Sequence, residues 1–441
     1  MTVSSRADLS IADLHGCLSD PYMDSMRFLS EFASRYPSAV SFASGRPSEV
    51  PFDDDLLERY LHRFRKYLSE TLGYDAAAIR RVLLQYGPTK GIINSLVAGN
   101  LLADEGIEAR PESVVVTTGC QEAMFLTLRA LCAGKRDAIL AVIPTYVGIT
   151  GAARLVDMPV LPVSSGSGAV DLPDLEAQIG RARQDGLRPR ACYVIPDFAN
   201  PSGMQMRLGE RRRMLEIAAR EDILVLEDNP YGLFHGGTRH MPTLKSLDES
   251  RRVVYLGSYA KTVTPGTRVG FVVADQTVVD PDGGGVTLLA DQIAKIKSMV
   301  TVNTSSVDQA VIGGALLECD GNLSGLVAPQ RAIYSENMKI VQRGLAARFR
   351  TGAGTPPGVS WNSPSGSFFT VVTVPFAADE EALAVSAAQF GVLWTPMRHF
   401  YTGQGGADQL RLSCSELSPE EIEDGLDRFA AFVRQYAGSP A

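Results

Sequence analysis

The stretch VVYLGSYAKTVTPGTRVGFVVA, residues 253–274, places two short apolar runs on either side of a polar loop. Runs of this length that are rich in valine and bounded by glycine or proline are typical of buried strands. The loop between them carries a serine, a lysine and an arginine, namely Ser258, Lys261 and Arg268. Because open α/β sheets bind ligands beyond the ends of their strands, this loop is a candidate functional site.

The same pattern extends toward the N-terminus. Comparable apolar runs occupy residues 114–118, 138–143, 191–195 and 223–227. Segments with the apolar spacing of helices fall between them, over 121–132 and 207–220. Strands that alternate with helices imply crossover connections, so we predict an α/β fold with a largely parallel sheet.

The C-terminal third follows a different pattern. It is mainly helical after residue 285, with a long helix predicted over 332–350, and the Gly/Pro-rich stretch TGAGTPPG then interrupts it at 351–358. Beyond the interruption, residues 367–374, 391–396 and 409–414 read as strands flanked by helices. We therefore predict a second, smaller α+β unit.

Composition narrows the classes of protein to consider. The 441 residues are enough for two or more packed units, and 45% hydrophobic with 21% charged residues is a globular balance. The net charge of −8, without a basic block, argues against nucleic acid as a partner. Six cysteines without paired spacing, and no apolar run of the roughly 18 residues that a membrane helix needs, predict a cytoplasmic protein without a membrane partner.

Several common catalytic motifs are missing from the sequence. The five histidines lack the spacing of a metal site, and we expect no metal. The G-x-S-x-G, G-x-G-x-x-G and phosphate-loop patterns are also absent. The run Arg211–Arg213 is most simply interpreted as a solvated helix face.

Polar groups do gather where the predicted strands end. The motifs are TTGCQEA at 117–123, PDFANPSG at 196–203, EDNPY at 227–231, SYAK at 258–261 and PGTR at 265–268. Taken singly, each has a plain structural explanation as a turn, a surface charge or an ion-pair member. Their ordered coincidence at one edge of a sheet instead predicts a single pocket.

The chemistry of that pocket points to one cofactor. A glycine-opened helix N-terminus, Arg268 and the Ser258 hydroxyl suit a phosphate dianion. The amine of Lys261 can condense with an aldehyde, and the carboxylate of Asp228 can keep a pyridine nitrogen protonated. Phosphate, aldehyde and pyridinium together describe pyridoxal 5′-phosphate.

The ordered set TTGCQEA, ANPSG, EDNPY, S-Y-A-K and PGTRVG resembles the fold-type I, class I/II aminotransferases over roughly residues 40–430. The resemblance implies a large cofactor domain at 76–325, built on a mostly parallel seven-stranded sheet between helices. It also implies an N-terminal segment at 1–75, which joins the small domain and the substrate entrance, and a small domain at 326–441. A homodimer with shared active sites is implied as well.

The resemblance also assigns roles to individual residues. Lys261, Asp228 and Tyr231 match the catalytic set, with Lys261 as the Schiff-base lysine and Asp228 as the partner of the pyridine nitrogen. The match to the cofactor-binding set comprises Gly119, Cys120, Gln121, Tyr146, Asn200, Asp228, Tyr231, Ser258, Lys261, Arg268 and, from the neighbouring subunit, Tyr86. The match to the substrate-binding set comprises Arg411, which grips the carboxylate, and Asn200, Phe42, Gly45, Phe400 and Tyr22.

The expected activity is exchange of an amino group between an L-amino acid and a 2-oxo acid by a ping-pong mechanism. LQYGPTKG, EDNPYG and LRLSCS are similar to the aminoadipate and aromatic branch, and GVLWTPMRHFYTG at 391–403 is similar to the hydroxyphenylglycine and dihydroxyphenylglycine transaminases of antibiotic biosynthesis. Aromatic substrates are therefore expected, including an arylglyoxylate with a tyrosine-like donor. The alternatives are an oxidase or decarboxylase with the same cofactor, or a non-enzymatic ligand-sensing domain.

Overall fold

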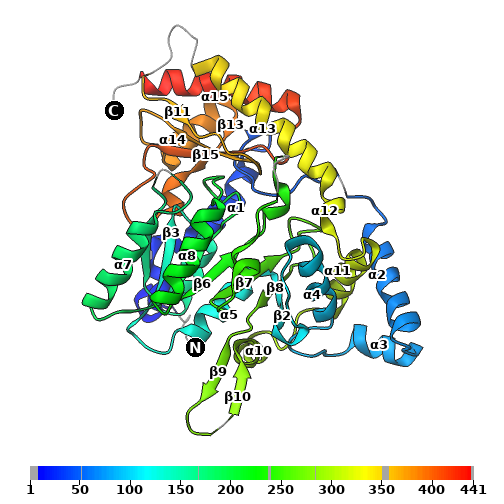
Figure 1. Ribbon diagram of the computed structural model, residues 1–441. Coiled ribbons are helices and arrows are strands. Elements are labelled where there is room, and N and C mark those ends of the chain that lie inside the picture. The colour runs from blue at the N-terminus through cyan, green and yellow to red at the C-terminus, as the bar shows by residue number, and fades with distance from the viewer. Residues whose placement is uncertain are drawn as a thin grey trace, which may run out of the picture.

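The larger unit of the computed structural model is built on a seven-stranded sheet with helices on both faces (Figure 1). The structure describes residues 8–50, 52–166, 168–236, 240–283, 285–349 and 357–438. The strand order is β2-β8-β7-β6-β5-β3-β4, and only β8 runs antiparallel to its neighbours. The strands are β2 (Val114–Thr118), β3 (Asp137–Ile143), β4 (Val160–Ser164), β5 (Arg188–Val194), β6 (Leu224–Asp228), β7 (Val253–Ser258) and β8 (Val269–Val273). The predicted α/β fold with a mostly parallel sheet is confirmed.

Two layers of helices explain why the central strands are almost continuously apolar. On one face, α7 (Leu172–Gln184) and α8 (Leu208–Arg220) bury Ile179 and Ile217 against strand residues such as Val225. On the other face, α5 (Gly119–Leu131) and α6 (Val147–Leu155) bury Leu128 and Ile149. A strand covered on both faces has no solvent side, so its sequence does not alternate between apolar and polar residues.

Arg211 corrects one sequence interpretation. It is fully buried rather than solvated, and its guanidinium forms an ion pair with the buried Asp197 at 2.6 Å. It also donates to the carbonyl oxygens of Pro196 and Pro242. The helix α8 therefore ties down the PDFANPSG loop that follows β5.

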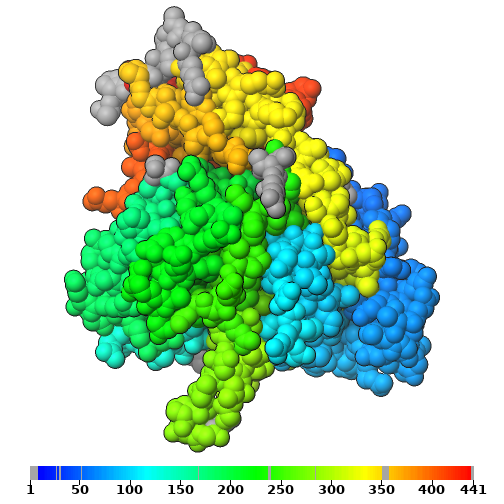
Figure 2. All heavy atoms as spheres, viewed as in Figure 1, coloured from blue at the N-terminus to red at the C-terminus, as the bar shows by residue number. Residues whose placement is uncertain are grey.

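Further helices and one hairpin lie around the large sheet. The hairpin of β9 (Thr277–Asp280) and β10 (Gly285–Leu288) extends away from the body of the molecule (Figure 2). The sequence pattern did not predict it, because two four-residue runs around DPDGGG carry little strand signal. The helices are α2 (Leu56–Lys66), α3 (Ala76–Leu84), α4 (Asn94–Glu105), α10 (Leu289–Val300) and α11 (Ser306–Glu318).

The smaller unit packs two long helices, α13 (Ala328–Phe349) and α15 (Pro419–Ala437), against an antiparallel sheet (Figure 1). That sheet has the order β11-β12-β15-β14, and the N-terminal strand β1 (Val40–Ser41) pairs with β13 (Val392–Leu393) of the same unit. Its strands are β11 (Ser360–Trp361), β12 (Phe369–Thr373), β14 (Thr395–Pro396) and β15 (Gln409–Ser413). The predicted interruption at 351–358 lies mostly outside the described residues.

Short elements connect these parts. They are α1 (Ser25–Glu31), α9 (Leu244–Leu247), α12 (Leu323–Leu326), α14 (Glu380–Val385), η1 (Ile11–Asp13), η2 (Gly16–Ser19), η3 (Pro21–Asp24), η4 (Phe32–Arg35), η5 (Tyr67–Thr71), η6 (Pro111–Ser113), η7 (Gly232–Phe234), η8 (Ser386–Phe390) and η9 (Met397–Phe400). Within the described part of the chain, no helix has the length and apolar character to cross a bilayer. We propose the domain division at residues 75 and 325, which the pairing of β1 with β13 supports at the N-terminal end.

Candidate active site

A cavity of about 580 Å³ lies where the parallel strands end, and residues of both units line it. Strands β2, β5, β6 and β7 deliver their following loops to this edge, as the rule for open α/β sheets requires. The predicted site residues that line the cavity are Gly45, Cys120, Gln121, Tyr146, Asn200, Asp228, Tyr231, Ser258, Lys261, Arg268, Phe400 and Arg411. The structure thus brings together most of the predicted set.

Asp228 is a buried carboxylate at the end of β6, with an exposed fraction of 3%. The hydroxyl of Tyr193 on β5 donates to its Oδ2 at 2.6 Å, and the thiol of Cys120 lies 3.5 Å from its Oδ1. Burial raises the pKa of Asp228 to about 6, and the two hydrogen bonds oppose that rise. A cationic partner such as a protonated ring nitrogen would lower this pKa and keep the carboxylate ionised.

Lys261 reaches into the cavity from the loop that follows β7. Its Nζ donates to the backbone carbonyl oxygen of Gly45 at 2.7 Å. Burial lowers the pKa of Lys261 to about 8, and the nearby charges of Arg411 and Arg268 add to that effect. A lysine with such a pKa is partly neutral near pH 8, which is the state that a nucleophile or a base needs.

One end of the cavity is shaped for an anion. Helix α5 begins at Gly119, whose φ of +72° is in the left-handed region that favours glycine. A Cβ on Gly119 would lie 2.5 Å from the Nη2 atom of Arg268, and one on Gly270 would lie 2.5 Å from the backbone nitrogen of Cys120. Two glycines therefore let a helix N-terminus, a guanidinium and strand β8 approach closely, which concentrates hydrogen-bond donors and positive charge.

Arg411 lies on β15 of the smaller unit and is almost completely buried. It donates to Asn200 Oδ1 at 2.6 Å and to the carbonyl oxygen of Ala43 at 2.8 Å. Its guanidinium carbon is 4.6 Å from the ring centre of Phe369 and 5.2 Å from that of Phe400. Its Nε has no hydrogen-bond partner, although it is buried. A carboxylate ligand fits this unmet donor and the planar, two-pronged shape of the group.

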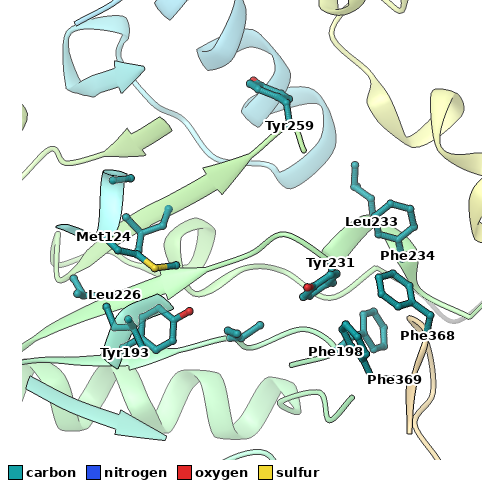
Figure 3. Close-up of a cluster of buried hydrophobic side chains, with 14 of the residues drawn as sticks. Met124, Tyr193, Phe198, Leu226, Tyr231, Leu233, Phe234, Tyr259, Phe368 and Phe369 are labelled. Carbon is teal, nitrogen blue, oxygen red and sulfur yellow. The ribbon is translucent and has the colours of Figure 1, made fainter. Parts of the chain in front are cut away.

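Aromatic rings form two of the cavity walls. Tyr231, which follows β6, packs edge-on against Phe368 and Phe369 with ring centres 5.7 and 5.6 Å away (Figure 3). Tyr146 lies at the start of α6, and its ring lies directly against Gly148. A Cβ added to Gly148 would be 2.2 Å from the Cε1 atom of Tyr146. Burial raises the pKa of both phenols above the usual value for tyrosine, so both stay protonated donors.

Two predicted substrate contacts are not at the cavity. Phe42 is fully buried, and a Cβ on Gly425 of α15 would lie 2.5 Å from its Cε2. The physical reason is strand alternation, because Ser41 and Ala43 face the cavity and the residue between them points to the opposite side.

Tyr22 in η3 packs against Arg154 instead, whose guanidinium carbon is 4.8 Å from the centre of the Tyr22 ring. Tyr86 is 85% exposed, and its predicted contact with a neighbouring subunit stays a prediction.

Tyr193, the partner of Asp228, and Glu416, which lines the cavity, were not among the predicted site residues. Tyr193 lies within an apolar strand, where its partner Asp228 comes from 35 positions away, so no local pattern marks it. Arg46 and Glu416 also line the cavity. The position of Arg46 resembles that of the substrate-facing N-terminal segment in the class I/II aminotransferases, which was a signal in the sequence, whereas no motif marked Glu416. Among the residues that the structure describes, no group of three potential metal ligands was found.

Known proteins resemble this chain over nearly its whole length. Residues 51–429 match the model of the family "Aminotransferase class I and II". The chain is 52% identical to a (S)-3,5-dihydroxyphenylglycine transaminase of Amycolatopsis orientalis over 425 residues, which covers 96% of this chain and 94% of the relative. It is 28% identical to a probable regulatory protein of rhizopine catabolism from Rhizobium meliloti, but spans only 55% of that protein.

A solved structure with a cofactor derivative bound has a similar fold. The α-aminoadipate aminotransferase of Thermus thermophilus, complexed with N-(5′-phosphopyridoxyl)-L-leucine, aligns with a TM-score of 0.77 at 27% identity. The alignment covers 97% of this chain and 99% of that one.

The cavity fits pyridoxal phosphate, the cofactor expected from the sequence. Its volume is within the range of about 300–1,000 Å³ that small-molecule sites occupy. An amine, a buried carboxylate and an anion-binding helix N-terminus are all present around it. Three buried polar atoms of its lining residues, Ser41 Oγ, Gln121 Oε1 and Arg411 Nε, have no hydrogen-bond partner within the described part of the protein, so they are free to bind a ligand.

Proposed function

The chain belongs to the class I and II aminotransferases, and from that membership we propose that its substrates are aryl α-amino acids and the matching 2-oxo acids. It is an enzyme that uses pyridoxal phosphate to exchange an amino group by a ping-pong mechanism. The observation that carries the substrate proposal is the 52% identity to a dihydroxyphenylglycine transaminase over 94% of that relative. An arylglyoxylate and its arylglycine are the favoured pair, with a tyrosine-like amino acid as donor.

We assign the cofactor contacts from the residues that line the cavity and from the start of α5 next to it. The N-terminus of α5 with Gly119, Cys120 and Gln121, the Ser258 hydroxyl and Arg268 hold the phosphate. Asp228 pairs with the ring nitrogen, Asn200 and Tyr231 hydrogen bond to the ring hydroxyl, and Tyr146 stacks on the ring. Bound pyridoxal phosphate supplies an aldehyde that accepts the amine and a cationic ring that withdraws electrons from the α-carbon.

Lys261 has two tasks in this proposal. Its Nζ anchors the aldehyde in the resting enzyme, and when the substrate amine takes its place, the freed amine removes the proton from the substrate α-carbon. The pKa of about 8 that burial gives this amine makes its neutral form accessible at moderate pH. The same nitrogen then returns the proton to the carbon atom of the cofactor's original aldehyde group.

Arg411 orients the substrate for that proton transfer. Its guanidinium is fixed by Asn200, Ala43 and Thr395, so a carboxylate that binds it is held in one position. Orientation of the α C–H bond selects loss of the proton over loss of carbon dioxide. An oxidase or decarboxylase with the same cofactor would not need a 2-oxo acid, so turnover that stops when the 2-oxo acid is omitted distinguishes the activities.

We also propose that two copies of the chain share their active sites. Tyr86 is 85% exposed, and exposed apolar side chains lie near it in sequence and at the end of α10, where Met299 is 86% exposed. A second copy would bury this surface and place Tyr86 against the neighbouring cofactor phosphate. Mixing inactive Lys261→Ala with impaired Tyr86→Ala chains would then restore activity, since one site per mixed dimer is intact.

A panel of half-reactions tests the substrate proposal. Purified holoenzyme is mixed with single amino acids, and conversion of the cofactor to its amino form is followed by absorbance. Arylglycines and tyrosine should convert it, and alanine should convert it far more slowly. Equal rates across the panel would contradict an aryl preference. A cytoplasmic location and a role in antibiotic biosynthesis stay predictions.

A further inference from the structure

Two charged side chains at the cavity have no task in the proposed reaction. Of the charged residues that line it, Asp228, Lys261, Arg268 and Arg411 are all assigned. Arg46 and Glu416 remain. Both are exposed at the opening, and neither forms an ion pair among the residues that the structure describes.

A hydrogen bond links the segments that carry these two side chains. The hydroxyl of Ser415 donates to the carbonyl oxygen of Arg46 at 2.6 Å, and the backbone N–H of Arg46 donates to Ser44 Oγ at 3.1 Å. Glu416 directly follows Ser415. An acidic and a basic side chain therefore start from neighbouring segments at the cavity, and neither has an ion-pair partner among the described residues.

This wall lies next to the reacting amine. Gly45, which precedes Arg46, accepts a hydrogen bond from Lys261 Nζ at 2.7 Å. The charges of both Glu416 and Arg46 act on the pKa of Lys261, in opposite directions. The substrate α-carbon must come within reach of that amine while its carboxylate binds Arg411. The substrate side chain leaves from the same α-carbon, so this wall is well placed to meet it.

We propose that Glu416 and Arg46 together recognise hydroxyl groups on the aromatic ring of the substrate. The inference rests on the proposed function and names the chemical feature that this site selects. A phenol is both donor and acceptor, so its O–H can donate to the carboxylate of Glu416 while its oxygen accepts from the guanidinium of Arg46. Hydrogen bonds to charged groups are stronger than neutral ones and improve discrimination against rings that lack the hydroxyl.

The two opposite charges also give an acidic side chain little net attraction. A glutamate substrate would place its distal carboxylate between an attractive guanidinium and a repulsive carboxylate, and the two effects oppose each other. A neutral hydroxyl meets no such repulsion. Removal of the Glu416 charge should therefore raise activity toward glutamate, and removal of the Arg46 charge should lower it. A purely structural role for either residue predicts no such opposite effects.

The test compares 3,5-dihydroxyphenylglycine with phenylglycine in the half-reaction of the holoenzyme. The wild-type enzyme should prefer the hydroxylated ring by about tenfold or more in kcat/KM, as expected for a hydrogen bond to a charged group. Glu416→Ala and Arg46→Met should each lose most of that preference, and Glu416→Gln less, because its amide oxygen still accepts. Glu49→Ala is the control, since Glu49 is an exposed acid on the same segment that does not line the cavity.

Two further measurements separate binding from chemistry and from general damage. The dissociation constants of unreactive 3,5-dihydroxyphenylacetate and phenylacetate should show the same loss of preference in the Glu416 variants. With glutamate as donor, Glu416→Gln should raise kcat/KM severalfold, and Arg46→Met should lower it. An increase in kcat/KM for glutamate in the Glu416→Gln variant cannot come from misfolding.

The outcomes distinguish the two proposals. If the wild-type enzyme converts neither arylglycine, the proposed substrate class is wrong and this inference falls with it. If it converts both, but Glu416→Ala and Arg46→Met keep the full preference for the hydroxylated ring, only the inference is overturned. A Glu416→Gln variant that loses activity toward glutamate would also overturn it.

Discussion

The phenol oxygen of Tyr193 lies 2.6 Å from Oδ2 of Asp228; both side chains are buried, and Asp228 lines the cavity. Tyr193 is one strand away, on β5, and lies close to Met124 and Leu226 in the core (Figure 3). Burial raises the pKa of Asp228, and the donated O–H opposes that rise. Tyr193 therefore helps to keep ionised the carboxylate that we assign to the cofactor ring.

Replacement of Tyr193 by phenylalanine removes that donor without changing the ring. A hydrogen bond to a charged group is worth about 1.5–3 kcal/mol, so we expect kcat to fall by roughly tenfold or more. The fall reflects a less stable charge on Asp228 and a weaker hold on the ring proton. Tyr334→Phe is the control, because that buried hydroxyl accepts from Ser48 in another part of the chain. Equal kcat for Tyr193→Phe and wild type would contradict the assigned role.

The low pKa of Lys261 predicts a pH dependence of stability in the protein without cofactor. Its pKa is about 8 in the folded state against an ordinary value of 10.5. The unfolded chain binds the proton more tightly, so the destabilisation is full below pH 8 and disappears as the pH rises through 10.5.

Urea unfolding of the apoprotein measures this effect when wild type is compared with Lys261→Met. The methionine variant should gain stability relative to wild type by up to about 3 kcal/mol at neutral pH, and the gain should shrink above pH 8. A difference that does not change with pH would show that Lys261 has an ordinary pKa.

Arg411→Lys keeps the charge but loses the planar, two-pronged contact. Because the guanidinium is held by Asn200 and Ala43, a flexible ammonium cannot reproduce its position. We expect kcat/KM for amino acids to fall by roughly a hundredfold, an effect of the size of one or two charged hydrogen bonds. Cofactor content should stay at the wild-type level. A variant with unchanged kcat/KM would exclude Arg411 as the carboxylate site.

A pair of glycine substitutions tests the close packing at the anion-binding end. Gly270→Ala would place a Cβ 2.5 Å from the backbone nitrogen of Cys120, so the start of α5 must move. We expect a loss of about 2 kcal/mol in stability together with weaker cofactor binding. Gly99→Ala in α4 has open space around it, so it should instead stabilise the protein by about 1 kcal/mol. If both variants bind the cofactor as wild type does, this close packing is not needed for binding.

The sequence predicted the parts of the site that follow strand ends. Asp228, Ser258 and Lys261 sit directly after apolar runs, and chain order alone brings such positions to one edge of a parallel sheet. Strand β4 was missed because VLPVS contains a proline and is partly exposed, as befits an edge strand.

The misses have a common physical origin, which is the direction of a side chain. Phe42 and Ser41 are neighbours, yet strand alternation puts one in the core and the other at the cavity, and this depends on a register that motifs do not reveal. Arg211 shares the buried face of α8 with Met214 and Ile217, so helical spacing did contain a signal for its burial. The role of Tyr193 depends on Asp228 from another strand, so the sequence around Tyr193 contained no signal for it.

Hydride reduction followed by mass spectrometry of the peptides tests the central claim most directly. Borohydride treatment of the purified holoenzyme should leave a phosphopyridoxyl group on the peptide that contains Lys261. The absorbance of the bound cofactor near the visible range should disappear together with the activity of the enzyme. Lys261→Ala should carry no such group at any lysine. A wild-type enzyme that is fully active but has its cofactor adduct on another residue, or no adduct after reduction, would contradict the account.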